Sequence, residues 1–169
     1  MTPFLELATH EISPTNRDDI VREFLPKLDS VRDDVEFDLA LWSLAQRLAV
    51  DTEELLRQIG ARWLKGSTLL TETLRDSGDE GPSEALRILF ARFRPSAEAP
   101  LPGMEAFSVE VIAVTNDRVR VTCEGARRCC SFIEGMARAL CEAFGVSLRY
   151  IRQPKRATRV LITFNCLAS

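Results

Sequence analysis

A proline-bearing segment divides this chain into two stretches of different periodicity, and this division constrains the fold more than any other feature. Residues 94–103 read RPSAEAPLPG, and the prolines at positions 95, 100 and 102 exclude regular helix. Before this segment the apolar residues recur at helical spacing, whereas after it they alternate with period two. The sequence therefore predicts a helical half and a β-rich half joined by a connection across the surface.

The first half contains several helical patterns with start and stop signals. A helix is predicted over residues 36–50, with one apolar face made of Phe37, Leu41, Leu44 and Leu48. Asp51 precedes the next helix as its cap, Glu54 completes a capping box, and Gly66 marks the end. Further helices are predicted over residues 67–78 and 82–93.

The second half alternates with period two around one helix. Residues 107–114 and 118–123 flank Asn116-Asp117, a predicted hairpin turn, and a helix over 131–145 leads to a second hairpin. The predicted class is α+β, with an N-terminal helical half packed on a C-terminal antiparallel sheet of β-β-α-β-β order. We expect a single domain over 1–169, with a helical subdomain 1–94, a Pro-rich connection 95–106 and a β-β-α-β-β subdomain 107–169.

Charge, hydropathy and cysteine content indicate the cellular location and the class of partner that this chain is expected to have. The chain has a formal net charge of −3, which gives no general attraction to nucleic acid, so a nucleic-acid partner is not expected. No apolar run reaches the length of about 20 residues that spans a bilayer. The N-terminus has no basic region typical of a signal peptide, and the cysteine count of 5 is odd. These features predict a cytoplasmic protein with free thiols. Its oligomeric state is left open.

The stretch VTCEGARRCC, residues 121–130, holds three of the five cysteines. Their spacing is not that of paired zinc ligands. Cys123, Cys141 and Cys166 fall on apolar faces, where cysteine usually behaves as a small core residue. Cys129 and Cys130 lie at a strand-to-helix transition beside two arginines. A helix N-terminus and nearby arginines lower the pKa of a thiol, so a reactive or metal-binding thiol at this turn is the alternative to a structural role.

The last hairpin carries a basic cluster. Its members are Arg149, Arg152, Lys155, Arg156 and Arg159. One interpretation is a solubilising turn, and the other is a docking patch for an acidic protein partner or a phosphate backbone. The negative total charge favours the first.

Nothing in the sequence predicts an enzyme. The chain has a single histidine, His10, and no Ser-His-Asp order, phosphate-binding loop, dinucleotide loop or zinc-protease motif is present. A cysteine nucleophile would need a base, and His10 lies far away in sequence.

Three stretches together resemble the heme nitric-oxide/oxygen-binding (H-NOX) domains. They are residues 33–64, with a D-E-L-L-x-x-x-G-x-x-W-like pattern ending at Trp63; residues 84–104, similar to the proximal helix and the proline segment after it; and residues 118–150, similar to the strand, turn, helix and strand that follow. The second half is similar to the four-vinyl-reductase-type sensor domains as well. The resemblance implies an H-NOX-like fold and a sensing or signalling role.

The departures from the family pattern imply a changed heme site. Where the family has an iron-ligating histidine on the proximal helix, this chain has Phe90, which cannot coordinate iron. The family's propionate-binding Y-x-S-x-R motif aligns with residues 123–127, where only Arg127 is retained, and a slip of one residue in this alignment is allowed. Pro102 loosely matches a proline that packs on the porphyrin. His10 is the remaining candidate ligand, although a surface or capping role is the simpler interpretation.

The sequence therefore predicts a heme-free H-NOX-like signalling or protein-interaction module, with a protein partner and without cofactor. A residual pocket for a small apolar ligand is expected to be lined by Phe4, Trp42, Phe90 and Met104. The alternative is a gas or redox sensor that holds heme through another ligand, or zinc through Cys129 and Cys130.

Overall fold

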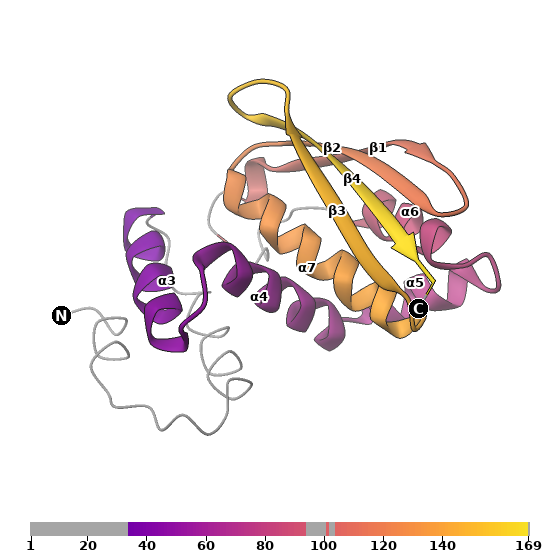
Figure 1. The fold of residues 1–169 in the computed structure, drawn as a ribbon, viewed down its shortest axis with the longest axis horizontal. Helices are drawn as coiled ribbons and strands as arrows, with labels where there is room; N and C mark the ends of the chain where they lie inside the picture. The colour runs from indigo at the N-terminus through magenta and orange to yellow at the C-terminus, as the bar shows by residue number, and fades with distance from the viewer. Residues whose placement is uncertain (1–33, 94–100, 102–103, 169) are drawn as a thin grey trace.

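The computed structural model of the 169-residue chain describes residues 34–93, 101 and 104–168. Four helices come first, followed by a short 3-10 turn and then a β-β-α-β-β unit (Figure 1). The helices are α3 (Asp34–Leu48), α4 (Thr52–Gly66), α5 (Thr68–Ser77) and α6 (Pro82–Arg92), and the turn is η1 (Met104–Ala106). The rest comprises β1 (Ser108–Val114), β2 (Arg118–Glu124), α7 (Arg127–Ala143), β3 (Ser147–Pro154) and β4 (Arg159–Leu167).

The helical patterns of the first half are confirmed. The predicted apolar face of α3 is buried throughout. Asp51 precedes α4 in extended conformation, and its Oδ1 accepts a hydrogen bond from the backbone N–H of Glu54 at 2.7 Å. This bond satisfies one of the free donors of the first turn, which is why the helix begins there. Pro82 begins α6, where a missing N–H costs no hydrogen bond.

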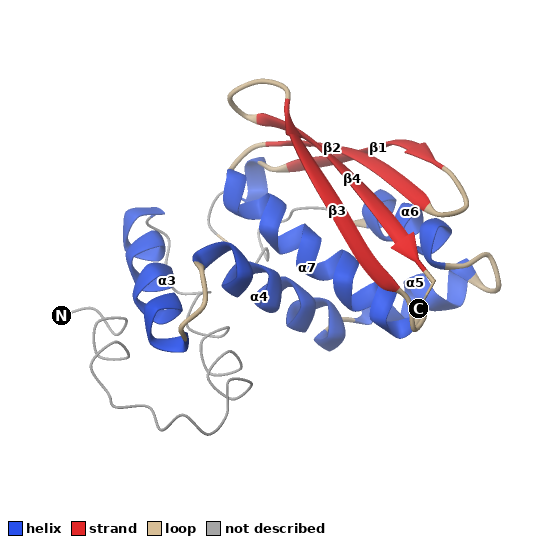
Figure 2. Cartoon of the chain, viewed as in Figure 1, coloured by secondary structure: helices blue, strands red, loops and turns tan. Residues whose placement is uncertain are grey.

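The predicted antiparallel sheet is also confirmed, and the helices that the structure describes lie on one side of it (Figure 2). The strand order is β1-β2-β4-β3. Val119 pairs with Phe164 and Val121 pairs with Ile162, and these side chains are fully buried against α6 and α7. The hairpin between β1 and β2 turns through Asn116-Asp117, with Thr115 N–H donating to the carbonyl of Arg118.

Helix α7 lies between the sheet and α4, and two glycines set its distance from α4 (Figure 1). A Cβ on Gly60 would lie 2.0 Å from the carbonyl oxygen of Phe132, and one on Gly135 would lie 1.9 Å from that of Arg57. Both distances are far below van der Waals contact, so only glycine permits this crossing. The crossing joins the helical half to the β-rich half at a fixed point.

The Pro-rich connection predicted over residues 95–106 lies largely outside the described residues. Within the part of the chain that the structure describes, no helix is long and apolar enough to cross a membrane.

Candidate functional site

Phe90 occupies the place on α6 that the resemblance assigns to an iron ligand, and its side chain is sealed in the core. It has no exposed surface, and its ring stacks on that of Phe164 from β4 with centroids 5.4 Å apart and planes 23° apart. Offset stacking of this kind adds to the free energy gained by burial. The ring is thus held by the sheet.

The rest of the buried face of α6 carries no iron-coordinating group either. The buried residues besides Phe90 are Ser83, Ala85, Leu86 and Leu89. Ser83 is the only polar one, and its hydroxyl donates to the carbonyl of Asn116 at 3.1 Å and lies 3.7 Å from Cys166 Sγ. The described part of α6 therefore does not fit a heme iron on this side.

The other residues predicted to line the pocket do not lie in one place. Met104 is fully buried at η1. Trp42 is 58 % exposed on α3, so its assignment to the pocket lining was wrong; it follows Val35 and Leu39 on the solvent face of the helix, opposite Phe37 and Leu41. Phe4, His10 and Pro102 lie outside the described residues.

The arginines at the start of α7 have different environments. The side chain of Arg127 is 82 % exposed, and its closest carboxylate is that of Glu53 at 3.8 Å. Arg128 is 13 % exposed, and it binds Asp34 and Asp38 of α3 at 2.5 and 2.8 Å. Its guanidinium also lies 5.4 Å from the centre of the Phe37 ring.

With a slip of one residue, Arg128 and not Arg127 takes the place of the motif's arginine. The carboxylates that Arg128 holds then belong to α3 of the same chain. Each terminal nitrogen of the guanidinium donates to a different carboxylate, and hydrogen bonds between ionised groups are stronger than neutral ones. Arg128 is thus already paired with carboxylates of its own chain.

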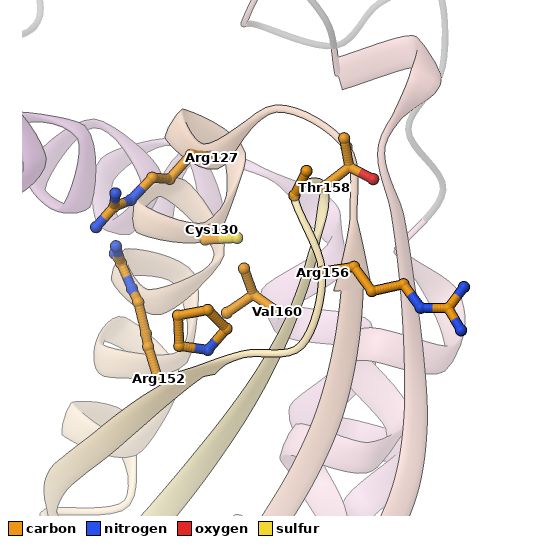
Figure 3. Close-up of a pocket in the computed structure, with 9 residues that line it drawn as sticks. Arg127, Cys130, Arg152, Arg156, Thr158 and Val160 are labelled. Atoms are coloured by element: carbon orange, nitrogen blue, oxygen red, sulfur yellow. The ribbon is translucent and has the colours of Figure 1, made fainter.

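A pocket opens beside the cysteine-rich turn (Figure 3). Gly125 makes the turn with a positive φ of 128°, and its N–H donates to the carbonyl of Thr158 at 2.9 Å, which draws the tip of the β3–β4 hairpin over the start of α7. The pocket has a volume of about 120 Å³ and is lined by Gly125, Arg127, Cys130, Arg152, Pro154, Arg156, Ala157, Thr158 and Val160. Arg127 and Arg152 extend toward one another on one side, whereas Arg156 points away.

Cys130 is paired with Cys123 of β2. The two thiols hydrogen-bond each other, and this bond together with the positive charges of Arg152 and Arg127 lowers the pKa of Cys130. The same bond and burial raise the pKa of Cys123. Ala126 precedes α7 at the N-cap position and has no side chain that could cap the helix, so the positive end of the helix dipole also favours a thiolate in the first turn.

A second thiol pair lies at the other end of α7. Cys141 Sγ and Cys166 Sγ of β4 are 4.0 Å apart and buried. Hydrogen bonds from Cys141 and Ser83 lower the pKa of Cys166 to about 7. The prediction that Cys123, Cys141 and Cys166 are core residues is confirmed by their burial, although the sequence did not indicate the pairs.

The described residues contain no group of three or more His, Cys, Asp or Glu side chains placed to hold a metal ion. Cys129 is fully buried and Cys130 is 2 % exposed. The alternative of a zinc site at this turn therefore has no ligand set in the part of the chain described.

Glu134 is the centre of an ion-pair network that the sequence analysis did not identify. Its carboxylate has no exposed surface and is held by Arg57 Nε of α4 at 3.0 Å and by Arg152 of β3 at 2.5 and 2.6 Å. Arg152 also donates to Ser131 at 2.8 Å and contacts Glu53 at 3.2 Å. Burial by itself would lower the pKa of Arg152, but its bonds to Glu134 raise it above the usual range.

The predicted docking cluster does not form one surface patch. Successive side chains of a strand point to opposite faces of the sheet, so the members of the cluster lie on different faces. Arg152 lies on the helix-facing side of β3 and is bound to Glu134, so it is not part of a surface patch. Arg149 pairs in register with Asn165, which pairs with Arg118, so these residues share the open face of the sheet. Lys155, Arg156 and Arg159 are exposed at the hairpin tip and the start of β4.

The open face holds further arginines that the sequence analysis did not group together. Arg118 and Arg120 of β2 are exposed on the same side as Arg149 and Arg159. The period-two pattern of Arg118, Arg120 and Thr122 could have indicated this, had the four strands been aligned.

No protein-family model matches the chain, and no curated protein matches it in sequence. Solved structures match its fold. The Fe(II) unliganded H-NOX protein from K. algicida aligns with 98% of this chain and 95% of its own at 16% identity and a TM-score of 0.59. A triple mutant of an H-NOX protein from S. oneidensis in the Fe(II) ligation state aligns with 99% of this chain and 97% of its own, at 12% identity and a TM-score of 0.59.

The H-NOX domain from Shewanella oneidensis in the Fe(II)CO ligation state covers 89% of this chain and 90% of its own at 13% identity, with a TM-score of 0.57. Likeness at these identities establishes the fold. The chain has the H-NOX-like α+β fold that the sequence resemblance predicted.

Proposed function

With the H-NOX-like fold as its premise, we propose that this chain is a signalling or protein-interaction module that works without heme. The observation that carries the proposal is the position of Phe90, fully buried on α6 and stacked on Phe164. A phenyl ring offers no lone pair to iron, and its removal from the core to admit a ligand would leave a void. The α6 side of the fold is therefore filled by a side chain.

The start of α7 supports the same proposal independently. Arg128 is bound by Asp34 and Asp38, so the arginine best placed to hold a cofactor's acid groups is already neutralised. Replacing these internal partners by an external anion would leave two carboxylates of α3 without their cation. This exchange would break the ion pairs by which Arg128 of α7 contacts α3.

We infer that the protein partner is acidic and docks on the open face of the sheet. The open face carries four arginines, which are Arg118, Arg120, Arg149 and Arg159. Glu124 lies on the same face opposite Arg159, so the arginines outnumber this carboxylate. Ile112 and Ile151 are 47 % and 57 % exposed and supply apolar contact area. A positive face on a protein of net charge −3 steers an acidic surface to one side of the molecule.

The residual space for a small apolar ligand is the open groove of about 510 Å³ between α6 and β1. It is lined by Arg87, Phe90, Ala91 and residues 109–114. Its walls come from the edge strand β1 and from α6, and they include the charged side chains of Arg87 and Glu110 beside the apolar residues.

The test is the heme content of protein produced in a heme-supplemented host. Absorption spectroscopy and iron analysis of the purified protein should give no Soret band and no stoichiometric iron. The competing function, gas sensing through a different iron ligand, predicts one heme per chain and a Soret band that His10→Ala removes.

A further inference from the structure

We propose that Cys130 and Cys123 form a reversible disulfide when a small hydroperoxide enters the pocket at the start of α7, which makes this turn an oxidant-sensing site. The inference gives the proposed signalling module its input and rests on that function only for its biological role. The chemistry itself depends on the turn and on no feature of α6.

The geometry provides an entrance, an attacking thiol and a resolving thiol in order. Cys130 lines the pocket of about 120 Å³, a space that accommodates a molecule the size of hydrogen peroxide. Cys123 on β2 has no exposed surface, does not line the pocket and interacts with the Cys130 thiol. An oxidant therefore reaches Cys130 first.

The surrounding charge favours Cys130 as the attacking thiolate. Arg127 and Arg152 extend along one wall of the pocket (Figure 3), and the uncapped start of α7 adds a positive dipole end. The hydrogen bond from Cys123 lowers the pKa of the Cys130 thiol, with Arg152 and Arg127 acting in the same direction. Glu134 opposes them, but its charge is balanced by Arg57 and Arg152.

The reaction proceeds in two steps that balance. The Cys130 thiolate attacks one oxygen of the hydroperoxide, so that a sulfenic acid forms and hydroxide (or alkoxide) leaves. The Cys123 sulfur then attacks the Cys130 sulfur, the disulfide bond forms, and water leaves with the remaining proton. Both cysteines are oxidised by one electron each, the peroxide is reduced by two electrons, and a dithiol reductant restores the thiols.

The bond would connect the sheet to the helical half through the start of α7. Cys123 lies near the end of β2, and Cys130 lies two residues beyond Arg128, which holds α3 through Asp34 and Asp38. Closing the disulfide draws the first turn of α7 toward β2, and the Arg128 side chain moves with that turn. The oxidation state of one thiol pair is thereby transmitted to α3.

The test is tryptic mapping of the whole chain after treatment with one equivalent of hydrogen peroxide and alkylation of the remaining thiols. Cleavage after Arg120, Arg127, Arg128 and Arg138 separates residues 121–127, which contain Cys123, from residues 129–138, which contain Cys129 and Cys130. We expect a covalent link between these two peptides that a dithiol reductant breaks. A link between residues 139–149 and 160–169 instead would place the reactive pair at Cys141 and Cys166 and would overturn the proposal.

Variants assign the roles of the two sulfurs. In Cys123→Ser the reaction should stop at a Cys130 sulfenic acid, which dimedone traps, whereas Cys130→Ser should give neither link nor adduct. Cys129→Ala is the matched control in the same peptide, and it should form the link at the wild-type rate. Loss of the link in Cys129→Ala, or a dimedone adduct on Cys129, would contradict the assignment.

The mapping on wild-type protein requires no substitution, so a variant that fails to fold does not leave the question open. It is also independent of heme. If the chain binds heme and still forms the Cys123–Cys130 link, only the proposed function is refuted. If the chain is free of heme and does not form the link, only this inference is refuted.

Discussion

Helices α6 and α7 cover the same face of one sheet, and both bury mainly apolar side chains, but only α7 also buries a charged group. The buried face of α6 is apolar except for Ser83, and its central residue is Phe90. The buried face of α7 contains Glu134, Ser131 and cysteine thiols among apolar residues such as Phe132 and Leu140. The helix that carries Phe90 thus buries no ionisable group, whereas α7 buries a carboxylate and several thiols.

The contacts of α6 and those of α7 depend on different kinds of interaction. The α6 contact depends on shape, because stacked rings and aliphatic side chains fill the space between helix and sheet. The α7 contacts depend on charge and hydrogen bonds, which respond to protons, oxidants and partners. Substitutions on the two helices should therefore have different consequences.

The largest effect is expected from Phe90→Ala on α6. Removing a fully buried ring that stacks on Phe164 should lower the free energy of unfolding by about 3 to 5 kcal/mol, as other large-to-small core changes do. Denaturant unfolding followed by circular dichroism measures it. Trp42→Ala, at a site 58 % exposed on α3, is the aromatic control and should change stability by less than about 1 kcal/mol.

Glu134→Ala on α7 should cost about 3 kcal/mol, because it leaves Arg57 and Arg152 partly buried without their shared carboxylate. Glu142→Ala removes the exposed partner of Lys65 from the same helix and should cost at most about 1 kcal/mol. Equal losses in the two variants, measured by urea unfolding, would show that the network around Glu134 is not what joins α7 to α4.

Gly135→Ala tests the crossing of α4 and α7. The added methyl would lie 1.9 Å from the carbonyl oxygen of Arg57, so the helices must separate, and we expect a loss of about 1 to 3 kcal/mol. Gly66→Ala at the end of α4 meets no atom within 4 Å and should be neutral or slightly stabilising. Thermal unfolding of both variants measures the difference, and a neutral Gly135→Ala would contradict the close approach.

The smallest expected effect is kinetic. Arg127→Gln should slow alkylation of Cys130 at neutral pH by a few-fold, because Arg127 helps to lower the pKa of that thiol. As pH falls through the thiol pKa the thiolate is protonated, so the rate should fall at higher pH in this variant than in the wild type. Arg156→Gln, whose side chain points away from the pocket, is the control and should leave the rate unchanged. Peptide mapping after timed iodoacetamide treatment gives both rates.

Local patterns predicted the elements well. The faces of α3 and β2, the Asp51 cap and the Asn116-Asp117 turn follow from spacing and turn chemistry within short windows. The burial of Phe90 agrees with an aromatic residue on the apolar face of a helix.

The site was less predictable, because its contacts are long-range. Arg152 was assigned to a surface patch, since no local pattern indicates that Glu134 lies across from it on α7. Trp42, which the sequence analysis expects in the lining of a residual pocket, falls on the solvent face of α3. The pairing of Cys123 with Cys130 depends on the turn at Gly125, and the pairing of Cys141 with Cys166 depends on the packing of α7 against β4.

Titration of the purified wild-type chain with hemin tests most directly the proposal that Phe90 fills the α6 side and that the chain takes no heme. We expect the spectrum of free hemin at every ratio, with no saturable Soret shift. A sharp Soret band that saturates at one hemin per chain would contradict it.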